Sequence, residues 1–508
     1  MSVVKRNLFA NYVGQVWVAI MGLAFIPLYI AYLGVESYGL IGMLAMLQAW
    51  FVLLDLGMTP VLNREMARFT AGGHNVESIR DLLRSVEVLA FAVSFVIAIA
   101  IWCASGWLAR DWLKPEALSV ETVVQAFAIM GVVVALRFVE GIYRSCLLGL
   151  QRQVLFNVVN SVMATLRAVG AVAILAWVSP TIEAFFIWQG VVSAISLFCL
   201  AWFVYSSLAP ADRHGRFSLQ ALHGVSRFAG GIMGITFLSL ILMQIDKVLL
   251  STLLDLAEYG QYMLASVVAG ALYMVASPIG QAWLPRLTEL HEQKKGAEFI
   301  RVYHLGAQLV SVVVGSVAAV LIVFADPVLL LWTRDPELVR SVSLLVSILV
   351  FGNLLNMLMW LPYRAQLASG WTSLAVRINV IAVLVIVPSI ILVVPSYGVE
   401  SAAWLWVCLN AGYLLLGVHF MYMKILRFEK WSWYKNDILK PIGAAFVVAI
   451  SIDTIIPVEQ LSWFFQVVVL ILAGCSIVLA AGVAAPDVRG RLLNYGLRWC
   501  HVFKNRIT

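Results

Sequence analysis

The sequence contains few charged residues and lacks the short motifs of common enzyme classes. Aspartate, glutamate, lysine and arginine make up 12% of its 508 residues, whereas hydrophobic residues make up 62%. It has no GxxxxGK[ST] loop for nucleotide phosphates, no HExxH zinc motif and no GxSxG nucleophile motif. We therefore expect neither an enzyme nor an ATP-driven pump, and no cofactor. Energy for transport would come from an H⁺ or Na⁺ gradient or from the substrate gradient.

Cysteine is also scarce, and its spacing indicates neither a metal site nor a disulfide framework. The chain has six cysteines without a CxxC pair, at positions 103, 146, 199, 408, 475 and 500. They lie in or beside apolar runs, so we expect no metal site.

Long apolar runs dominate the chain and predict an all-α polytopic membrane protein, because no water-soluble core absorbs so much apolar sequence. The first run is not followed by a small-x-small cleavage site, so we expect a retained span rather than a signal peptide. We count fourteen runs, near 8–33, 38–62, 82–108, 118–146, 154–178, 181–205, 227–253, 258–285, 302–324, 340–363, 371–394, 398–423, 440–457 and 460–485.

The basic residues fit this count when both termini are cytoplasmic. The predicted inner segments then hold 26 of the 34 lysines and arginines, and the outer segments hold only Arg110, Lys114, Arg334 and Arg340. This bias follows the positive-inside rule. The net charge of +7 therefore indicates orientation in a membrane rather than binding to nucleic acid.

Matching dipeptides suggest a duplicated six-helix unit. Three matches recur in order at offsets of 217 to 221 residues: Tyr38-Gly39 with Tyr259-Gly260, Tyr143-Arg144 with Tyr363-Arg364, and Glu183 with Glu400. An even number of helices per copy places the pseudo-symmetry axis along the membrane normal. We predict an N-lobe at 1–205, a cytoplasmic linker at 206–226, a C-lobe at 227–425, an appended helix pair at 426–486 and a basic cytoplasmic tail at 487–508.

Charged residues inside the predicted spans are the candidate functional residues. The basic ones are Arg137, Arg167, Lys247 and Arg377, and the acidic ones are Asp55, Glu140 and Asp246. Consecutive helical residues point about 100° apart, so Asp246 and Lys247 are predicted to be poor partners.

Arg167 lies near the middle of its predicted span, where a charge costs about 2.5–3.5 kcal/mol on insertion scales. It has no acid within one helical turn, so its partner must come from another helix, solvent or a ligand. Arg137 and Glu140 are three residues apart and could pair on one helix face. These arginines either pack helices together or hold an anionic ligand, and the sequence leaves both readings open.

Two further polar features could line a transport pathway. Asn7, Asn11 and Gln15 are spaced four residues apart, which fits either interhelical hydrogen bonds or the wall of a wet cavity. Asp55 lies close to Gly57 and Pro60, which could open the helix. It could pair with an arginine such as Arg64, or serve with Glu140 and Asp246 in gating or ion coupling.

Four stretches of the chain resemble Wzx-type oligosaccharide flippases, of the polysaccharide-transporter branch of the multidrug/oligosaccharidyl-lipid/polysaccharide exporter superfamily. They are YLGVESYGL, LLDLGM followed by NREMAR, QIDKVLLS followed by EYG, and YRSCLLGLQR before an Asn-rich run. The resemblance covers most of residues 5–425. It implies two six-helix lobes around a central cavity, and alternating access that moves an undecaprenyl-diphosphate-linked glycan across the bacterial inner membrane for O-antigen, capsule or exopolysaccharide synthesis.

The resemblance also implies a cationic cavity for the diphosphate-sugar, which maps onto Arg137, Arg167, Lys247 and Arg377. It implies contacts with membrane lipid and, as protein partners, a glycan polymerase and chain-length proteins. The appended pair resembles that of lipid II flippases, in which it borders a groove for the lipid tail. The alternatives are a multidrug exporter of the same fold, whose cavity would be acidic and aromatic, and a non-transporting scaffold of a glycan-assembly complex.

Overall fold

The computed structural model describes residues 3–55, 57–70, 73, 75–113, 115–208, 210, 213, 215–220, 223, 241, 244–371 and 373–491. Within these ranges every regular element is a helix, as the apolar runs predict. Twelve helices of the described part are long and apolar enough to cross a membrane. They account for every predicted run except two. Run 8–33 overlaps α1 (Val3–Ala24), and run 227–253 lies partly outside the described residues. The chain is a multi-pass membrane protein, and the count of fourteen stays a prediction.

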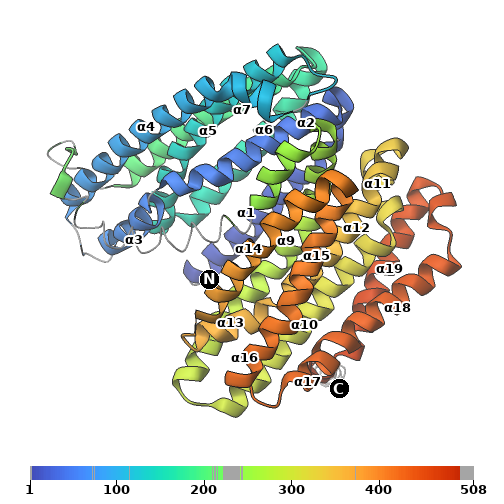
Figure 1. Cartoon of the computed structure of the whole chain (residues 1–508). Helices are drawn as coiled ribbons and strands as arrows, with labels where there is room; N and C mark the ends of the chain where they lie inside the picture. Colours follow the sequence, from blue (N-terminus) through green and yellow to red (C-terminus); the bar gives the residue numbers. More distant parts are fainter. Residues whose placement is uncertain are drawn as a thin grey trace, which may run out of the picture. The chain divides into compact units, whose positions relative to one another are not determined.

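The helices form two compact units, Met1–Gly260 and Gln261–Thr508 (Figure 1). The predicted linker 206–226 lies largely outside the described residues, so the proposed lobe boundaries also stay predictions. The first unit contains α1, α2 (Ile26–Phe51), α3 (Met58–Thr70), α4 (Val76–Trp107), α5 (Val120–Gly149), α6 (Gln153–Trp177), α7 (Ile182–Ser207) and the start of α9 (Leu256–Glu292).

The second unit continues along α9 and adds the remaining helices. These are α10 (Gly296–Val323), α11 (Ala325–Thr333), α12 (Pro336–Leu358), α13 (Trp360–Ala368), α14 (Ser373–Tyr397), α15 (Val399–Gly412), α16 (Val418–Lys424), α17 (Lys430–Ser432), α18 (Lys440–Ile455) and α19 (Trp463–Ala484). Short π-helical segments join some of them: η2 (Leu108–Trp112), η3 (Tyr413–Gly417) and η4 (Trp433–Leu439).

Capping side chains explain where several long helices begin. Asn75 accepts a hydrogen bond from the Ser78 backbone N–H at 2.7 Å at the start of α4. Ser119 caps α5 and Thr181 caps α7 in the same way. Asp335 caps α12, whose first residue is a proline. Each cap satisfies a backbone N–H that has no partner within its helix.

The predicted break between the first two runs coincides with Gly34, where two helical stretches of α2 meet. Gly34 lies within α2 with φ 81° and ψ 165°, a conformation that a side chain would strain. The predicted opening beside Asp55 is also present. There the 3₁₀ turn η1 (Val52–Asp55) ends; Gly57 has a φ of 78°, and α3 begins at Met58 as a separate helix.

The first dipeptide pair of the predicted repeat meets within the first unit. An added Cβ on Gly39 would lie 2.6 Å from the carbonyl oxygen of Leu256, and one on Gly260 would lie 2.5 Å from that of Val35. Only glycine permits two backbones to approach this closely. The start of α9 therefore crosses α2 at two glycines.

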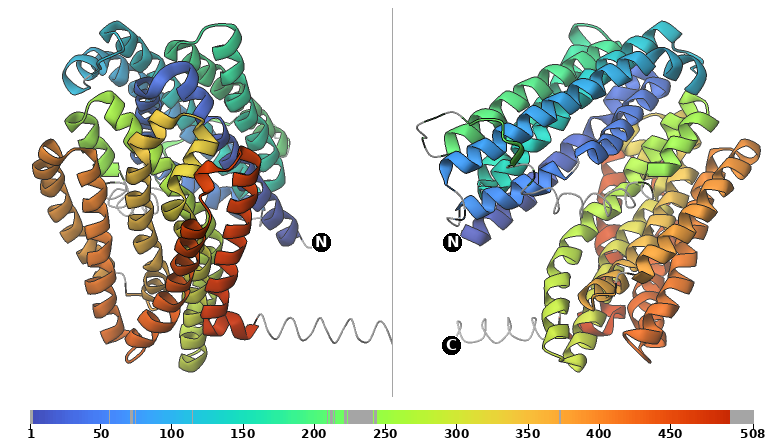
Figure 2. Two further views of the ribbon diagram at one scale, coloured as in Figure 1. Left: turned by 90° about the vertical axis from the view of Figure 1, so that its right-hand side faces the viewer. Right: turned by 60° about the vertical axis from the view of Figure 1, so that its left-hand side comes forward.

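Each unit has its own apolar core. In the first unit, buried side chains of α3, α4, α5, α6 and α7 form one cluster, and these helices run side by side (Figure 2). In the second unit, α10 packs against α18 and α19, which are drawn in orange-red. Small residues such as Ala445, Ala449 and Ala473 allow this contact to be close.

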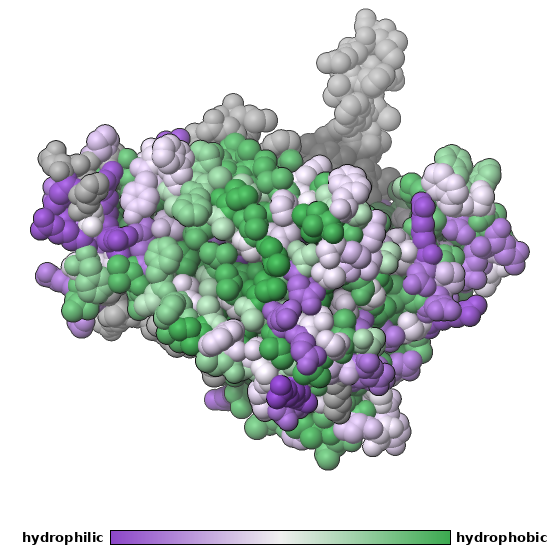
Figure 3. All heavy atoms as spheres, turned by 90° about the horizontal axis from the view of Figure 1, so that it is seen from above, coloured by the Kyte–Doolittle hydropathy of each residue, from purple (hydrophilic) through white to green (hydrophobic). Residues whose placement is uncertain are grey.

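Large apolar side chains also cover much of the outside. Trp177 is 85% exposed and Phe198 is 75% exposed. Figure 3 shows broad hydrophobic areas on the face that it draws. Such a surface is suited to contact with lipid rather than water.

Candidate functional site

Four helices of the first unit bring polar side chains together around Arg137 and Arg167. Arg137 and Glu140 come from α5, and Arg167 lies near the middle of α6. The helix α7 contributes three polar residues spaced i, i+4 and i+7, which therefore share one face: Gln189, Ser193 and Ser196. Gln48 of α2 completes this polar cluster.

Arg167 pairs with the acid of a neighbouring helix, one of the partners that the sequence left open. Its Nη2 lies 2.9 Å from Oε2 and 3.3 Å from Oε1 of Glu140. Ser196 donates a further hydrogen bond to Glu140 at 2.9 Å. The arginine and glutamate side chains are 20% and 15% exposed, so the ion pair is mostly withdrawn from solvent.

Arg137 does not pair with Glu140, one of the readings that the sequence left open, because Glu140 contacts Arg167 instead. Arg137 donates to three neutral groups: Gln189 Oε1 at 2.7 Å, Gln48 Oε1 at 3.0 Å and Ser193 Oγ at 3.2 Å. Neutral acceptors satisfy its N–H groups but leave its charge uncompensated.

The polar cluster therefore carries one positive charge in excess among the described residues, from two arginines and one carboxylate. It also contains buried donors without a hydrogen-bond partner, namely Arg167 Nε and Gln48 Nε2. Buried polar groups usually have partners, so unpaired donors beside an excess positive charge favour an anionic ligand.

The other two basic residues of the predicted cavity are Lys247, in the first unit, and Arg377, in the second. Lys247 Nζ is 3.3 Å from Asp246 Oδ2, so the expectation that these neighbours would not pair is wrong. The long lysine side chain bridges the angle between them. Arg377 lies in the second turn of α14 in the second unit, with an exposed side chain. Within the first unit, the structure thus groups Arg137, Arg167 and Glu140.

Asp55 ends η1 just before α3, and its carboxylate caps the N-terminus of that helix. It accepts hydrogen bonds from the Thr59 backbone N–H at 3.1 Å and from the Thr59 hydroxyl at 2.8 Å. A carboxylate at a helix N-terminus is favoured by the exposed N–H groups and the helix dipole. The structure thus gives Asp55 a partner other than the arginine considered from the sequence.

The predicted stripe on α1 divides into different environments. Asn11 donates to Gln153 Oε1 at 2.8 Å and accepts from Asn157 at 2.6 Å, which joins α1 to α6. Gln15 is exposed. The side chain of Asn7 lies outside the described residues.

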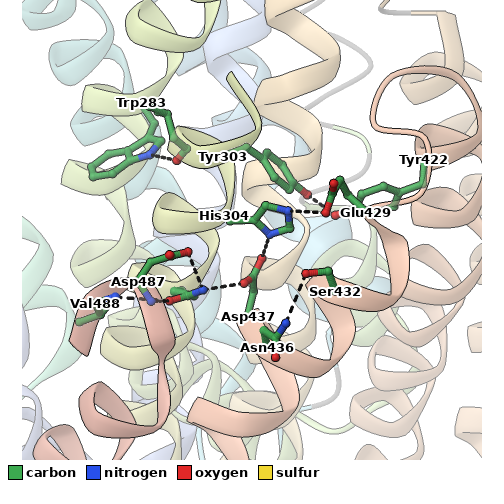
Figure 4. A network of polar contacts seen from close by, with 12 residues as sticks. Trp283, Tyr303, His304, Tyr422, Glu429, Ser432, Asn436, Asp437, Asp487 and Val488 are labelled. Carbon is green, nitrogen blue, oxygen red and sulfur yellow. Dashed lines mark hydrogen bonds and ion pairs between the residues drawn. The ribbon is translucent and has the colours of Figure 1, made fainter. Parts of the chain in front are cut away.

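A second polar cluster was missed from the sequence and lies in the second unit (Figure 4). His304 and Gln308 of α10 contact three acids of the final helix pair and its flanking segments: Glu429, Asp437 and Asp487. The available signal was a histidine within an apolar run followed four residues later by glutamine.

An apolar groove in the second unit is a poor candidate for a charged group. Its volume is about 380 Å³, and its lining is Val328, Leu331, Trp332, Val467, Leu470 and Ile471. These residues offer almost no polar contact to a phosphate. Among the described residues, no three histidines, cysteines or acids are arranged to hold a metal ion.

Comparisons with known proteins agree with the helical fold and a transport role. The sequence model of the family described as "Polysaccharide biosynthesis protein" matches residues 4–291. A Shigella flexneri protein named "Putative O-antigen transporter" is 22% identical over 409 residues, which cover 80% of this chain and 94% of that protein.

Solved structures with a similar fold are also transporters. The lipid II flippase MurJ in an inward closed conformation has a TM-score of 0.68 at 12% identity, covering 94% of this chain and 98% of that chain. An inward-facing multidrug resistance MATE family transporter of the MOP superfamily has a TM-score of 0.63 at 14% identity, covering 84% and 96%. These relatives are transporters and a flippase, which agrees with the expectation of a non-enzymatic protein.

Proposed function

Because this chain belongs to the polysaccharide biosynthesis protein family and has the fold of MOP transporters, we propose that it flips a lipid-linked oligosaccharide. The substrate would carry a polyprenyl diphosphate, and alternating access would move its glycan from the inner to the outer leaflet of the bacterial inner membrane. The Shigella relative, a protein named for O-antigen transport, supports an O-antigen or related polysaccharide precursor.

The main observation in support of this proposal is the excess positive charge at Arg137. Its hydrogen bonds go to neutral glutamine and serine side chains rather than to a carboxylate. A diphosphate supplies the missing negative charge, and charge-assisted hydrogen bonds are about twice as strong as neutral ones. In this proposal Arg137 and Arg167 hold the diphosphate, and Glu140 positions Arg167. A cavity for cationic drugs would need the opposite charge.

Lys247 and Arg377 remain candidates for further steps of the same path. Each lies in a predicted span, and a diphosphate that moves through the protein would meet successive cationic groups. Asp55, Glu140 and Asp246 are the candidates for H⁺ or Na⁺ coupling. The lipid and any polymerase or chain-length protein would be its partners, and both termini would lie in the cytoplasm.

The test is a flipping assay in proteoliposomes with a fluorescent undecaprenyl-diphosphate-linked sugar. Charged hydrogen bonds contribute about 1.5–3 kcal/mol each, so Arg137→Gln should reduce flipping by about 10- to 100-fold at subsaturating substrate. Arg137→Lys should retain part of the activity, because it keeps the charge but loses the planar geometry.

Arg144→Gln is the matched control. Arg144 lies about two turns further along the same helix and is exposed, with its guanidinium 5.3 Å from the Phe156 ring. Its variant should flip at the wild-type rate. Normal flipping by a well-folded Arg137→Gln protein would instead favour a purely structural arginine and a scaffold role.

A further inference from the structure

His304 lies between two carboxylates where the final helix pair meets α10 (Figure 4). Its Nδ1 contacts Asp437 Oδ2 in a short hydrogen bond, and its Nε2 lies 3.2 Å from Glu429 Oε2. His304 is 8% exposed and Asp437 is 1% exposed. The histidine is therefore held in place on both sides of its ring.

This geometry requires one more proton than a neutral histidine and two ionised carboxylates carry together. A neutral imidazole has one N–H donor and one nitrogen lone pair, whereas ionised carboxylates can only accept. With both ring nitrogens facing carboxylate oxygens, a neutral ring would direct its lone pair at an anion. The repulsion disappears when the imidazole is protonated or when one carboxyl carries the proton.

The surroundings add negative rather than positive charge. Gln308 donates to Asp437 Oδ1 at 2.8 Å and to Asp487 Oδ2 at 2.9 Å, which brings a third acid close. In the part of the chain that the structure describes, lysine and arginine form no ion pair with these three acids.

The other titratable neighbours that the structure describes do not supply a cation either. Tyr303 and Tyr422 share a hydrogen bond with each other at 2.8 Å beside the imidazole. Lys430 contacts His419 and two aromatic rings. Among the described residues, a proton is therefore the positive charge available to these three acids.

The same contacts fasten the final helix pair to the rest of the second unit. Glu429 precedes α17, Asp437 lies in η4 before α18, and Asp487 follows α19. Gln308 also accepts from the Asp487 backbone N–H at 2.8 Å. His304 and Gln308, one turn apart on α10, thus contact the segments that precede α18 and follow α19.

We propose that His304, Asp437 and Glu429 form a proton-binding site that clasps the final helix pair to α10. With the proton bound, the imidazole bridges both acids. When the proton leaves, a lone pair faces a carboxylate and the segment 429–437 separates from α10. This site is independent of the proposed transport substrate, and its test does not measure transport.

Electron–electron distance measurements between two nitroxide labels test the clasp in the full-length protein. Suitable positions are Ala297 at the start of α10 and Lys435 in η4, which are both exposed, in a background without native cysteines. The distance distribution should be narrow at low pH and broad at high pH. An unchanged distribution from pH 5 to pH 10 would overturn the proposal.

Two variants identify the group that binds the proton. His304→Gln should give the broad distribution at every pH, because an amide does not titrate, whereas the exposed control His291→Gln should keep the wild-type response. Asp437→Asn removes an anion that stabilises the proton, so its transition should shift to lower pH. A wild-type response in His304→Gln, or an unshifted transition in Asp437→Asn, would assign the response to another group and refute the clasp.

Discussion

The N–H donors of an arginine in a membrane helix can bind a carboxylate or neutral oxygen atoms, and the polar cluster contains one arginine of each kind. Arg167 meets a carboxylate, which neutralises its charge, whereas Arg137 meets neutral oxygens, which do not. Removing one partner of a buried ion pair leaves an uncompensated charge and costs about 3–5 kcal/mol. The two arginines should therefore respond differently to substitution.

Arg167→Ala should reduce both folded yield and flipping, because it leaves Glu140 without its partner. The double variant Arg167→Ala/Glu140→Ala should recover folded yield but not flipping, because the diphosphate still lacks a cation. Arg167→Lys should retain partial flipping, and Arg167→Glu should abolish it. Size-exclusion profiles and the proteoliposome assay measure the two properties separately. Recovery of flipping in the double variant would show that Arg167 only packs against Glu140.

Asp55 allows a similar separation of charge from structure. Asparagine caps helices about as well as aspartate, whereas alanine costs about 0.5–2 kcal/mol. Asp55→Asn should therefore fold normally, and it should flip poorly if the carboxylate couples an ion. Asp55→Ala should also lower the melting temperature. If Asp55→Asn flips normally and only Asp55→Ala is impaired, Asp55 is a cap for α3 and not a coupling site.

At the scale of elements, the sequence predicted most helices because apolar runs determine where a chain crosses a membrane. The predicted runs 154–178 and 181–205 correspond to α6 and α7 within two residues at each end. The run 258–285 ends too early, since α9 continues to Glu292. Arg286 donates to Glu289 at 2.8 Å within this extension and lowers the pKa of its carboxyl. An ion pair three residues apart supports a helix where hydropathy has already fallen.

The polar clusters were less predictable because their contacts depend on packing. Sequence spacing allowed Glu140 to pair with Arg137, but the approach of α5 to α6 brings Arg167 closer. Asp437 and Asp487 lie outside the predicted apolar runs, so hydropathy gave no reason to link them with His304. The contacts of His304 and Gln308 with these acids join residues more than a hundred positions apart, and a single sequence does not specify them.

The crossing of α2 and α9 gives a prediction at this scale. Because an added Cβ on Gly260 would lie 2.5 Å from the Val35 carbonyl oxygen, Gly260→Ala should force the helices apart. Overpacking of this kind typically costs about 1–3 kcal/mol, so the melting temperature should fall. Gly270→Ala on the same helix is the control, since its Cβ would meet no atom within 4 Å. Equal stability of the two variants would contradict this close crossing.

At the scale of the whole molecule, the positions of the basic residues predict how the chain is oriented in the membrane. Twelve helices of the described part have the length and hydropathy needed for a membrane span. The predicted runs 8–33 and 227–253 are not represented among these twelve. If both also cross, the number of spans is even and the two termini share one side. The predicted excess of positive charge would place that side in the cytoplasm.

Single cysteines in a cysteine-free background test this topology with a membrane-impermeant thiol reagent in intact cells. Gln220, Glu292 and Lys435 are exposed and lie in predicted inner segments, so cysteines there should be protected. Ala117, Glu337 and Glu459 are exposed in predicted outer segments and should be labelled. Ala257 is decisive because run 227–253 separates it from Gln220. Labelling at 257 with protection at 220 requires that run to cross the membrane. The same response at both positions, with permeabilised cells confirming that each cysteine reacts, would rule out the fourteen-span arrangement.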